Sequence, residues 1–215
     1  MKAVGWILSV CAAFVAHAAR TQCAVSILSE WTVFRKKDLT PWNVLKSHVG
    51  GANVAAAFCR MQTVPIDMAT YYDALPTRAY CGLFYFPEVR PTPCYEAFRA
   101  WNELAKLGTS VAVESSAKGV YAAAAKGAAG RAVLVCNVGE DPDAPVPSVS
   151  VDVHGIDETF RIYRMDGRHD KLSDCGAWRG GAVEIPPCGI VLALSGTTLG
   201  EVQTTSGKAK SLNGL

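Results

Sequence analysis

The chain has 215 residues, of which 50% are hydrophobic and 19% are charged, and its formal net charge at pH 7 is +2. This composition predicts a folded chain with a substantial core. The small net charge, with no basic patch interleaved with aromatic residues, argues against binding to nucleic acid or to a membrane surface. The 8 cysteines and 4 histidines lack the spacing of a zinc site, so we expect no metal and no cofactor.

Residues 1–18 fit two predictions. Met1-Lys2, an apolar run and the small-x-small sequence Ala16-His17-Ala18 are typical of a signal peptide, which would direct the protein to the periplasm or the extracellular space. The same run also predicts a helix of a folded domain, and the protein would then be cytoplasmic. The residues of its apolar face recur at helical spacing: Ile7, Val10, Cys11, Phe14, Val15 and Ala18. No later stretch predicts a transmembrane helix.

The run from Cys23 to Trp31 predicts a strand that ends in two functional side chains. Short apolar runs with β-branched residues are typical of buried, parallel strands. In barrel enzymes, catalytic groups project from the C-terminal ends of such strands. Glu30 is therefore a candidate nucleophile, and Trp31 is a candidate platform for a sugar ring. The alternative is an ordinary surface glutamate at the end of a strand.

Helices and strands alternate over the next eighty residues. Gly50 to Gln62 predicts a helix, which Thr63-Val64-Pro65 ends, because proline disfavours helix at the preceding residue. A second short strand follows from Ile66 to Asp73, and then a long aromatic loop from Leu75 to Thr92. Thr92 as N-cap, Pro93 at the first position and Gly108 as C-cap delimit the next helix. This order predicts a parallel α/β layer.

These segments resemble the last quarter of a clan A glycoside hydrolase barrel, and family 39, the β-xylosidase and α-L-iduronidase family, is the nearest match. The pieces that carry the resemblance are Ile27 to Trp31, Met68 to Asp73, Cys81 to Phe84 and Arg90 to Leu104. The resemblance implies that the first piece is the seventh barrel strand with Glu30 as nucleophile, and that the second is the eighth strand. It also implies a sugar subsite lined by Trp31, Tyr71, Tyr72, Asp73 and Phe84. The alternatives are core or interface packing for the tyrosines and covering of the barrel mouth for Phe84.

The resemblance further implies that the catalytic unit is incomplete. Such a barrel typically needs about 250 residues, whereas only about 30 residues precede Glu30. The acid/base glutamate of the family follows an asparagine on the fourth strand, and the one Asn-Glu pair here, Asn102-Glu103, falls in the final helix. We therefore expect residues 1–108 to be the C-terminal portion of a barrel domain, inactive unless a complementing N-terminal barrel chain supplies the rest. In this interpretation residues 1–18 form the helix before the seventh strand.

From Thr109 onward the chain changes to short strands separated by turn signals, which predicts an antiparallel β-sandwich over residues 109–196. Residues 197–215 lack apolar periodicity and predict a disordered tail. The fold class expected is thus α/β plus all-β, a partial (β/α)8 barrel followed by a C-terminal sandwich. The predicted strands are Ser110–Glu114, Val120–Ala124, Ala132–Asn137, Ser148–Val153, Phe160–Met165, Ala182–Ile185 and Ile190–Leu194.

The cysteines divide into two groups. Cys11, Cys59, Cys94 and Cys136 lie inside helix or strand patterns, where buried thiols are expected. Cys175 and Cys188, in contrast, flank a predicted hairpin. They could pair if the protein is exported, and the sequence leaves open whether this disulfide forms.

Three functional hypotheses follow from the sequence. The first is a fragment of a retaining glycosidase that acts on an oligo- or polysaccharide. The second is a secreted, non-catalytic β-sandwich module that binds carbohydrate or packs against a partner domain. The third is a non-functional remnant.

Overall fold

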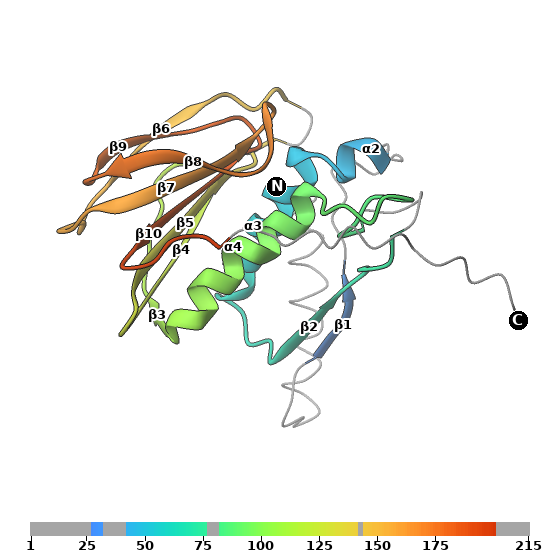
Figure 1. Ribbon diagram of the computed structural model, residues 1–215, viewed down its shortest axis with the longest axis horizontal. Helices are drawn as coiled ribbons and strands as arrows, with labels where there is room; N and C mark the ends of the chain where they lie inside the picture. The colour runs from blue at the N-terminus through green and yellow to red at the C-terminus, as the bar shows by residue number, and fades with distance from the viewer. Residues whose placement is uncertain (1–26, 32–41, 77–81, 142–143, 201–215) are drawn as a thin grey trace, which may run out of the picture.

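The computed structural model describes residues 27–31, 42–76, 82–141 and 144–200. Figure 1 shows four successive layers: a parallel strand pair, two helices, a six-stranded antiparallel sheet and a second strand pair. The side chains of six residues within these ranges are not described: Ile27, Ser29, Glu30, Trp31, Trp42 and Asn43. The predictions for residues 1–18 and for most of the C-terminal tail lie outside the described residues.

The parallel pair consists of β1 (Ile27–Trp31) and β2 (Met68–Tyr71). The two strands are hydrogen-bonded neighbours, and their ladder joins Trp31 to Tyr71 after an irregularity that begins at Leu28. This pairing confirms the prediction that the two short strands are adjacent and parallel. Because parallel strands end on the same side of a sheet, the residues that close β1 and β2 lie at one edge.

Three helices accompany this pair: α2 (Trp42–Leu45), α3 (His48–Met61) and α4 (Pro93–Leu107). Helix α3 is rich in glycine and alanine, and its buried residues include Gly50, Gly51 and Ala55. A Cβ atom on Gly51 would lie 2.6 Å from both the Met165 methyl carbon and the Pro93 carbonyl oxygen. The helix predicted from Gly50 is therefore confirmed, and only a small residue fits where it crosses α4.

The caps of α4 are those predicted from the sequence. Thr92 is extended, Pro93 opens the helix, and Gly108 closes it in the left-handed conformation, with a φ of 82°. The Thr92 hydroxyl makes no cap bond to the helix and instead donates to the Gly82 carbonyl oxygen at 3.0 Å. The N-cap residue of α4 thus also holds the base of the preceding loop.

The antiparallel part contains a six-stranded and a two-stranded sheet. All seven strands predicted from Thr109 onward are present, with ends shifted by a few residues. In spatial order, the larger sheet comprises β3 (Thr109–Val111), β4 (Val120–Gly127), β5 (Gly130–Asn137), β10 (Ile190–Ser195), β7 (Phe160–Asp166) and β8 (His169–Trp178). The smaller sheet pairs β6 (Val149–Val153) with β9 (Gly181–Ile185).

Strand β8 is absent from the sequence prediction. β8 is the outer strand of the six-stranded sheet, so most of its side chains are exposed, and Leu172 alone among them is buried. A largely exposed edge strand has no apolar alternation, and this is why the pattern did not predict it.

Two apolar cores lie on the two faces of the six-stranded sheet. The larger core joins β1, α3 and α4 to the sheet and includes Leu28, Met165 and Leu192. The smaller core lies between the two antiparallel sheets and includes Phe160 and Val191. The predicted boundary at residues 108–109 coincides with the junction of α4 and β3, but side chains from both sides of that boundary share the larger core.

The chain after residue 196 begins with ordered contacts. The Leu199 amide donates to the Tyr163 hydroxyl at 3.0 Å, and Arg99 donates to the Gly200 carbonyl oxygen. Residues 197–200 thus pack onto the domain, unlike the disordered tail predicted from residue 197. Among the described residues, none of the helices combines the length and apolarity needed to cross a bilayer.

The cysteines of the described residues are all thiols. Cys59, Cys94 and Cys136 are buried, as predicted, and burial raises the pKa of the Cys136 thiol, with a further contribution from neighbouring Cys59. Cys175 and Cys188, whose pairing the sequence left open, do not form a disulfide with each other. Cys175 is exposed on the edge strand β8, while Cys188 is buried in the turn between β9 and β10.

Candidate functional site

The candidate site lies where β1 and β2 end. Glu30 and Trp31 close β1, and Tyr71 closes β2, with Tyr72 and Asp73 directly after it. Because Trp31 pairs with Tyr71, the parallel ladder brings these five predicted residues to one edge of the strand pair. The side chains of Glu30 and Trp31 lie outside the description, so their roles as nucleophile and sugar platform stay predictions.

The two tyrosines have different surroundings. The Tyr71 ring packs edge-on against Phe98 of α4, with 5.2 Å between ring centroids. Tyr72 follows at the end of the strand, where successive side chains point to opposite sides, and it is 39% exposed. Tyr71 therefore supports the strand from the helix side, whereas Tyr72 is accessible to a ligand.

Asp73 holds a buried acceptor for which the described residues provide no donor. Its carbonyl oxygen accepts from the Leu83 amide at 3.1 Å, but its side-chain oxygen Oδ1 is buried without a hydrogen-bond partner. Gly82 lies directly against this oxygen, since a Cβ on that glycine would be 3.5 Å away. Buried polar atoms normally have partners, and leaving one without a partner costs free energy. Among the described residues, Oδ1 of Asp73 is therefore an acceptor without a donor.

The long loop expected after β2 is folded back on itself over residues 83–92. The Tyr85 amide donates to the Arg90 carbonyl at 2.8 Å, and the Val89 amide donates to the Tyr85 carbonyl at 3.0 Å. Phe84 forms an isolated antiparallel bridge with Pro91. Backbone hydrogen bonds thus close this part of the long aromatic loop that the sequence predicted.

Phe84 packs against α4. Its ring centroid lies 5.4 Å from that of Tyr95, and its side chain is partly buried. Phe86 and Val89, near the tip of the folded loop, are exposed instead. The role predicted for Phe84 in lining a sugar subsite stays a prediction, and its contact with Tyr95 attaches the loop to α4.

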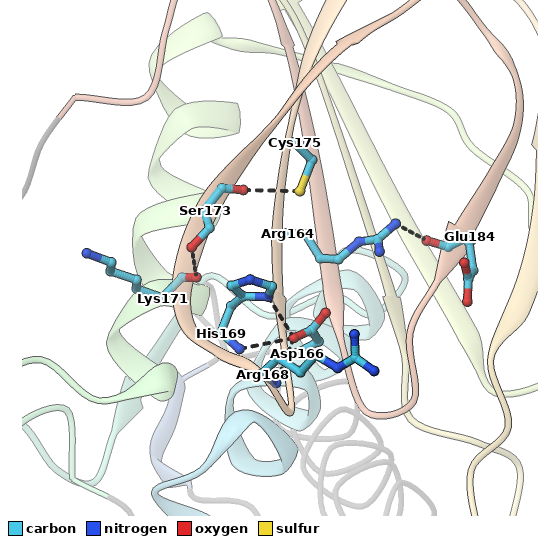
Figure 2. Close-up of polar contacts among 8 residues, drawn as sticks. All are labelled: Arg164, Asp166, Arg168, His169, Lys171, Ser173, Cys175 and Glu184. Carbon is cyan, nitrogen blue, oxygen red and sulfur yellow. Dashed lines mark hydrogen bonds and ion pairs between the residues drawn. The ribbon is translucent and has the colours of Figure 1, made fainter.

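The sequence did not single out the polar cluster on the β7–β8 hairpin, which Figure 2 shows in close-up. Asp166 accepts from the amides of Arg168 at 2.8 Å and His169 at 3.0 Å, and its carboxylate is 2.9 Å from the His169 ring nitrogen Nδ1. Further along, Arg164 donates to the Glu184 carbonyl oxygen at 3.1 Å. An aspartate ending a strand before a glycine is the one sequence signal for such a turn.

The carboxyl of Asp166 makes the hairpin sensitive to acid. Burial acts to raise the pKa of Asp166, but the bonds from Arg168 and His169 outweigh it, so the pKa lies below its ordinary value. A carboxyl with a lowered pKa stabilises the fold above its unfolded-state pKa, and this contribution is lost as the pH falls through the folded-state pKa. We expect Asp166→Asn to be less stable than the wild type at pH 7 and to lose less stability between pH 5 and pH 2. Urea unfolding across this range measures both, and parallel pH profiles would contradict the role of Asp166.

Within the described part of the chain, no group of three His, Cys, Asp or Glu side chains is arranged to hold a metal ion.

No protein-family model and no curated protein matches this chain. Its fold is similar to that of several solved glycoside hydrolases. A family 30 subfamily 8 xylanase from Clostridium acetobutylicum is 14% identical, with a TM-score of 0.55 over 82% of this chain and 43% of the xylanase. The catalytic domain of the family 30 xylanase C from Talaromyces cellulolyticus is 16% identical, with a TM-score of 0.55 over 79% and 40%. A family 44 xyloglucanase from Paenibacillus polymyxa is 10% identical, with a TM-score of 0.52 over 80% and 32%.

These identities show a shared fold. The chain spans less than half the length of each of these enzymes. The matches support the predicted resemblance to glycoside hydrolases, and they fall in families 30 and 44 rather than supporting family 39 in particular.

Proposed function

We propose that this chain is the C-terminal portion of a retaining glycoside hydrolase with family 39-like, β-xylosidase-type chemistry. In this proposal β1, α3, β2 and α4 are the last two βα units of a (β/α)8 barrel, and the antiparallel sheets are its sandwich domain. The observation that carries the proposal is the parallel pairing of β1 with β2, which brings Glu30 and Tyr72 to one edge. The similarity in fold to xylanases supports an oligo- or polysaccharide of the xylan type as substrate.

The proposed chemistry is double displacement. The carboxylate of Glu30 attacks the anomeric carbon, the glycosidic oxygen leaves with a proton from a second carboxyl group, and a covalent glycosyl-enzyme forms. The second carboxylate then takes a proton from water, which attacks the same carbon and releases Glu30. Tyr72 and Trp31 would stack against sugar rings, and Oδ1 of Asp73 would accept from a sugar hydroxyl.

The second carboxyl group, the general acid/base, is proposed to come from another polypeptide. Retaining enzymes hold the two carboxyl groups about 5–5.5 Å apart. Glu103, from the one Asn-Glu pair of the sequence, is buried on α4 and forms an ion pair with Lys106 at 2.8 Å. It therefore has a structural partner, and we propose that a complementing N-terminal barrel chain contributes the acid/base residue.

The isolated chain is expected to show no hydrolysis of aryl β-xylosides above background. Losing a general acid/base group typically costs about 10²–10⁴-fold in rate, and here the strand that carries it is proposed to come from elsewhere. A continuous assay of nitrophenol release from the purified chain measures this. Turnover by the pure chain that Glu30→Gln abolishes would contradict the assignment of the acid/base group to another chain.

A non-catalytic module is the second candidate. The observation that favours it is the separate core between the two antiparallel sheets, which includes Phe160, Ile185 and Val191. If this were the function, saccharide would bind on the antiparallel sheets and substitution of Tyr72 or Asp73 would leave binding unchanged. Calorimetric titration of xylotetraose into the wild type, Tyr72→Ala and Asp73→Asn separates the two candidates.

A further inference from the structure

We propose that the β7–β8 hairpin positions the folded loop at residues 83–92, and through it Asp73, by means of the Arg90–Asp170 ion pair. Arg90 and Asp170 are 80 residues apart in the sequence and belong to the two parts of the chain on either side of residue 108. The ligand-related part of this inference rests on the proposed function.

The loop is held from both of its sides. On one side, Arg90 Nη1 donates to Asp170 Oδ2 at 2.8 Å. The same guanidinium lies over the Tyr85 ring, with its Cζ atom 4.2 Å from the ring centroid. On the other side, the Tyr85 hydroxyl donates to the Lys46 carbonyl oxygen at 3.1 Å. Stacking on Tyr85 fixes the orientation of Arg90, so the ion pair with Asp170 has a defined geometry.

Asp170 lies in an irregular part of β8. Between the pairs Arg164–Ser173 and Asp166–His169, β7 advances by two residues and β8 by four. Asp170 is one of the β8 residues between these two pairs, next to His169. An irregularity of this kind interrupts the regular alternation of side chains along a strand, and the Asp170 carboxylate pairs with Arg90 here.

The β7–β8 hairpin also contacts helices α3 and α4, and these contacts fix its position relative to the loop. The Leu172 amide donates to the buried Oε2 of Glu96 on α4 at 3.2 Å. At the hairpin tip, Gly167 lies against His48 at the start of α3, where an added Cβ would be 3.5 Å from the imidazole ring. Asp170 lies between these two attachments, and its position follows from theirs.

A series of backbone hydrogen bonds connects Arg90 to Asp73 through the loop. The Tyr85 amide donates to the Arg90 carbonyl, and the Thr92 amide donates to the Leu83 carbonyl at 2.9 Å. The Leu83 amide in turn donates to the carbonyl of Asp73, the residue with the unpartnered buried oxygen. Arg90 and Asp170 are therefore positioning residues for the acceptor that we propose binds a sugar hydroxyl.

Amide hydrogen exchange of the full chain tests whether the Arg90–Asp170 ion pair stabilises the loop at residues 83–92. In Asp170→Asn, the amides of Tyr85 and Val89 are expected to exchange about fivefold faster, the effect typical of losing an exposed ion pair. Asp170→Glu keeps the charge and is expected to restore most of the protection. The matched control is Asp174→Asn, which removes another exposed ion pair, with Arg161, from the same strand. Equal exchange in wild type and Asp170→Asn, or equal acceleration by Asp174→Asn, would overturn the inference.

The affinity for xylotetraose tests whether the Arg90–Asp170 ion pair affects saccharide binding at Asp73. Asp170→Asn is expected to weaken binding about three- to fivefold, and Asp73→Asn to weaken it more, while Asp174→Asn leaves it unchanged. Unchanged affinity in Asp170→Asn, in a chain that binds the saccharide, would overturn the ligand-related part. A chain that binds no saccharide would overturn that part together with the proposed function, and the exchange experiment would still decide whether the hairpin positions the loop.

Discussion

Replacing Glu96 by alanine is expected to lower the free energy of unfolding by about 3–5 kcal/mol, the effect of breaking a buried ion pair from one side. Glu96 is 3% exposed, and its Oε2 accepts from Arg99 at 2.9 Å and from the Leu172 amide at 3.2 Å. Its removal leaves a largely buried guanidinium and a buried amide without their acceptor. The loss is large because one carboxylate joins α4 to the edge strand of the antiparallel sheet.

Glu103→Ala is the matched control for this prediction. Glu103 lies on the same helix and also pairs with a residue three positions later, but that residue, Lys106, is 59% exposed at its side chain. In the described structure Glu103 makes no hydrogen bond to the sheet. Glu103→Ala is therefore expected to lower the free energy of unfolding by about 1 kcal/mol or less. Urea unfolding of both variants measures the difference, and equal losses would contradict the linking role of Glu96.

Asn137→Asp is expected to lower the free energy of unfolding at pH 7 by about 2–3 kcal/mol. Asn137 is fully buried at the end of β5, and its side-chain amide donates to the carbonyls of Pro147 at 2.8 Å and Pro186 at 3.4 Å. Its Oδ1 accepts from the Gly139 amide. An ionised carboxylate keeps the last bond but cannot donate, and it faces two carbonyl oxygens in a buried position.

The pH dependence separates this cause from a simple packing defect. A protonated carboxyl group can donate one hydrogen bond, so the loss in Asn137→Asp relative to the wild type is expected to shrink at pH 4. Asn102→Asp on the exposed face of α4 is the control, with little expected change. A deficit in Asn137→Asp that is independent of pH would contradict the hydrogen-bonding role of this side chain.

Local sequence signals predicted most helices and strands, because caps and turn residues act on the backbone within a few residues of themselves. Thr92, Pro93 and Gly108 delimit α4 without reference to the rest of the chain, since proline and glycine restrict or free the backbone locally. Apolar runs with turn signals likewise predicted β1, β2 and seven antiparallel strands. Strand β8 was missed because only Leu172 among its side chains is buried.

The directions of the site side chains depend on packing that the sequence does not reveal. Tyr71 and Tyr72 are adjacent and chemically alike, yet α4 provides Phe98 as a partner for Tyr71, and Tyr72 is left accessible. The unpartnered oxygen of Asp73 and the pairing of Arg90 with Asp170 arise from residues brought together by the tertiary fold. The sequence pattern does not predict these contacts, because the residues involved are far apart along the chain.

Mapping a saccharide titration by NMR tests most directly the claim that the ends of β1 and β2 form a glycosidase subsite. Xylotetraose is expected to shift the amide signals of Glu30, Trp31, Tyr72, Asp73 and Gly82, and to leave those of β6 and β9 unchanged. Shifts confined to the antiparallel sheets would favour the non-catalytic module. Shifts nowhere at millimolar saccharide would contradict a sugar site at the ends of these two strands.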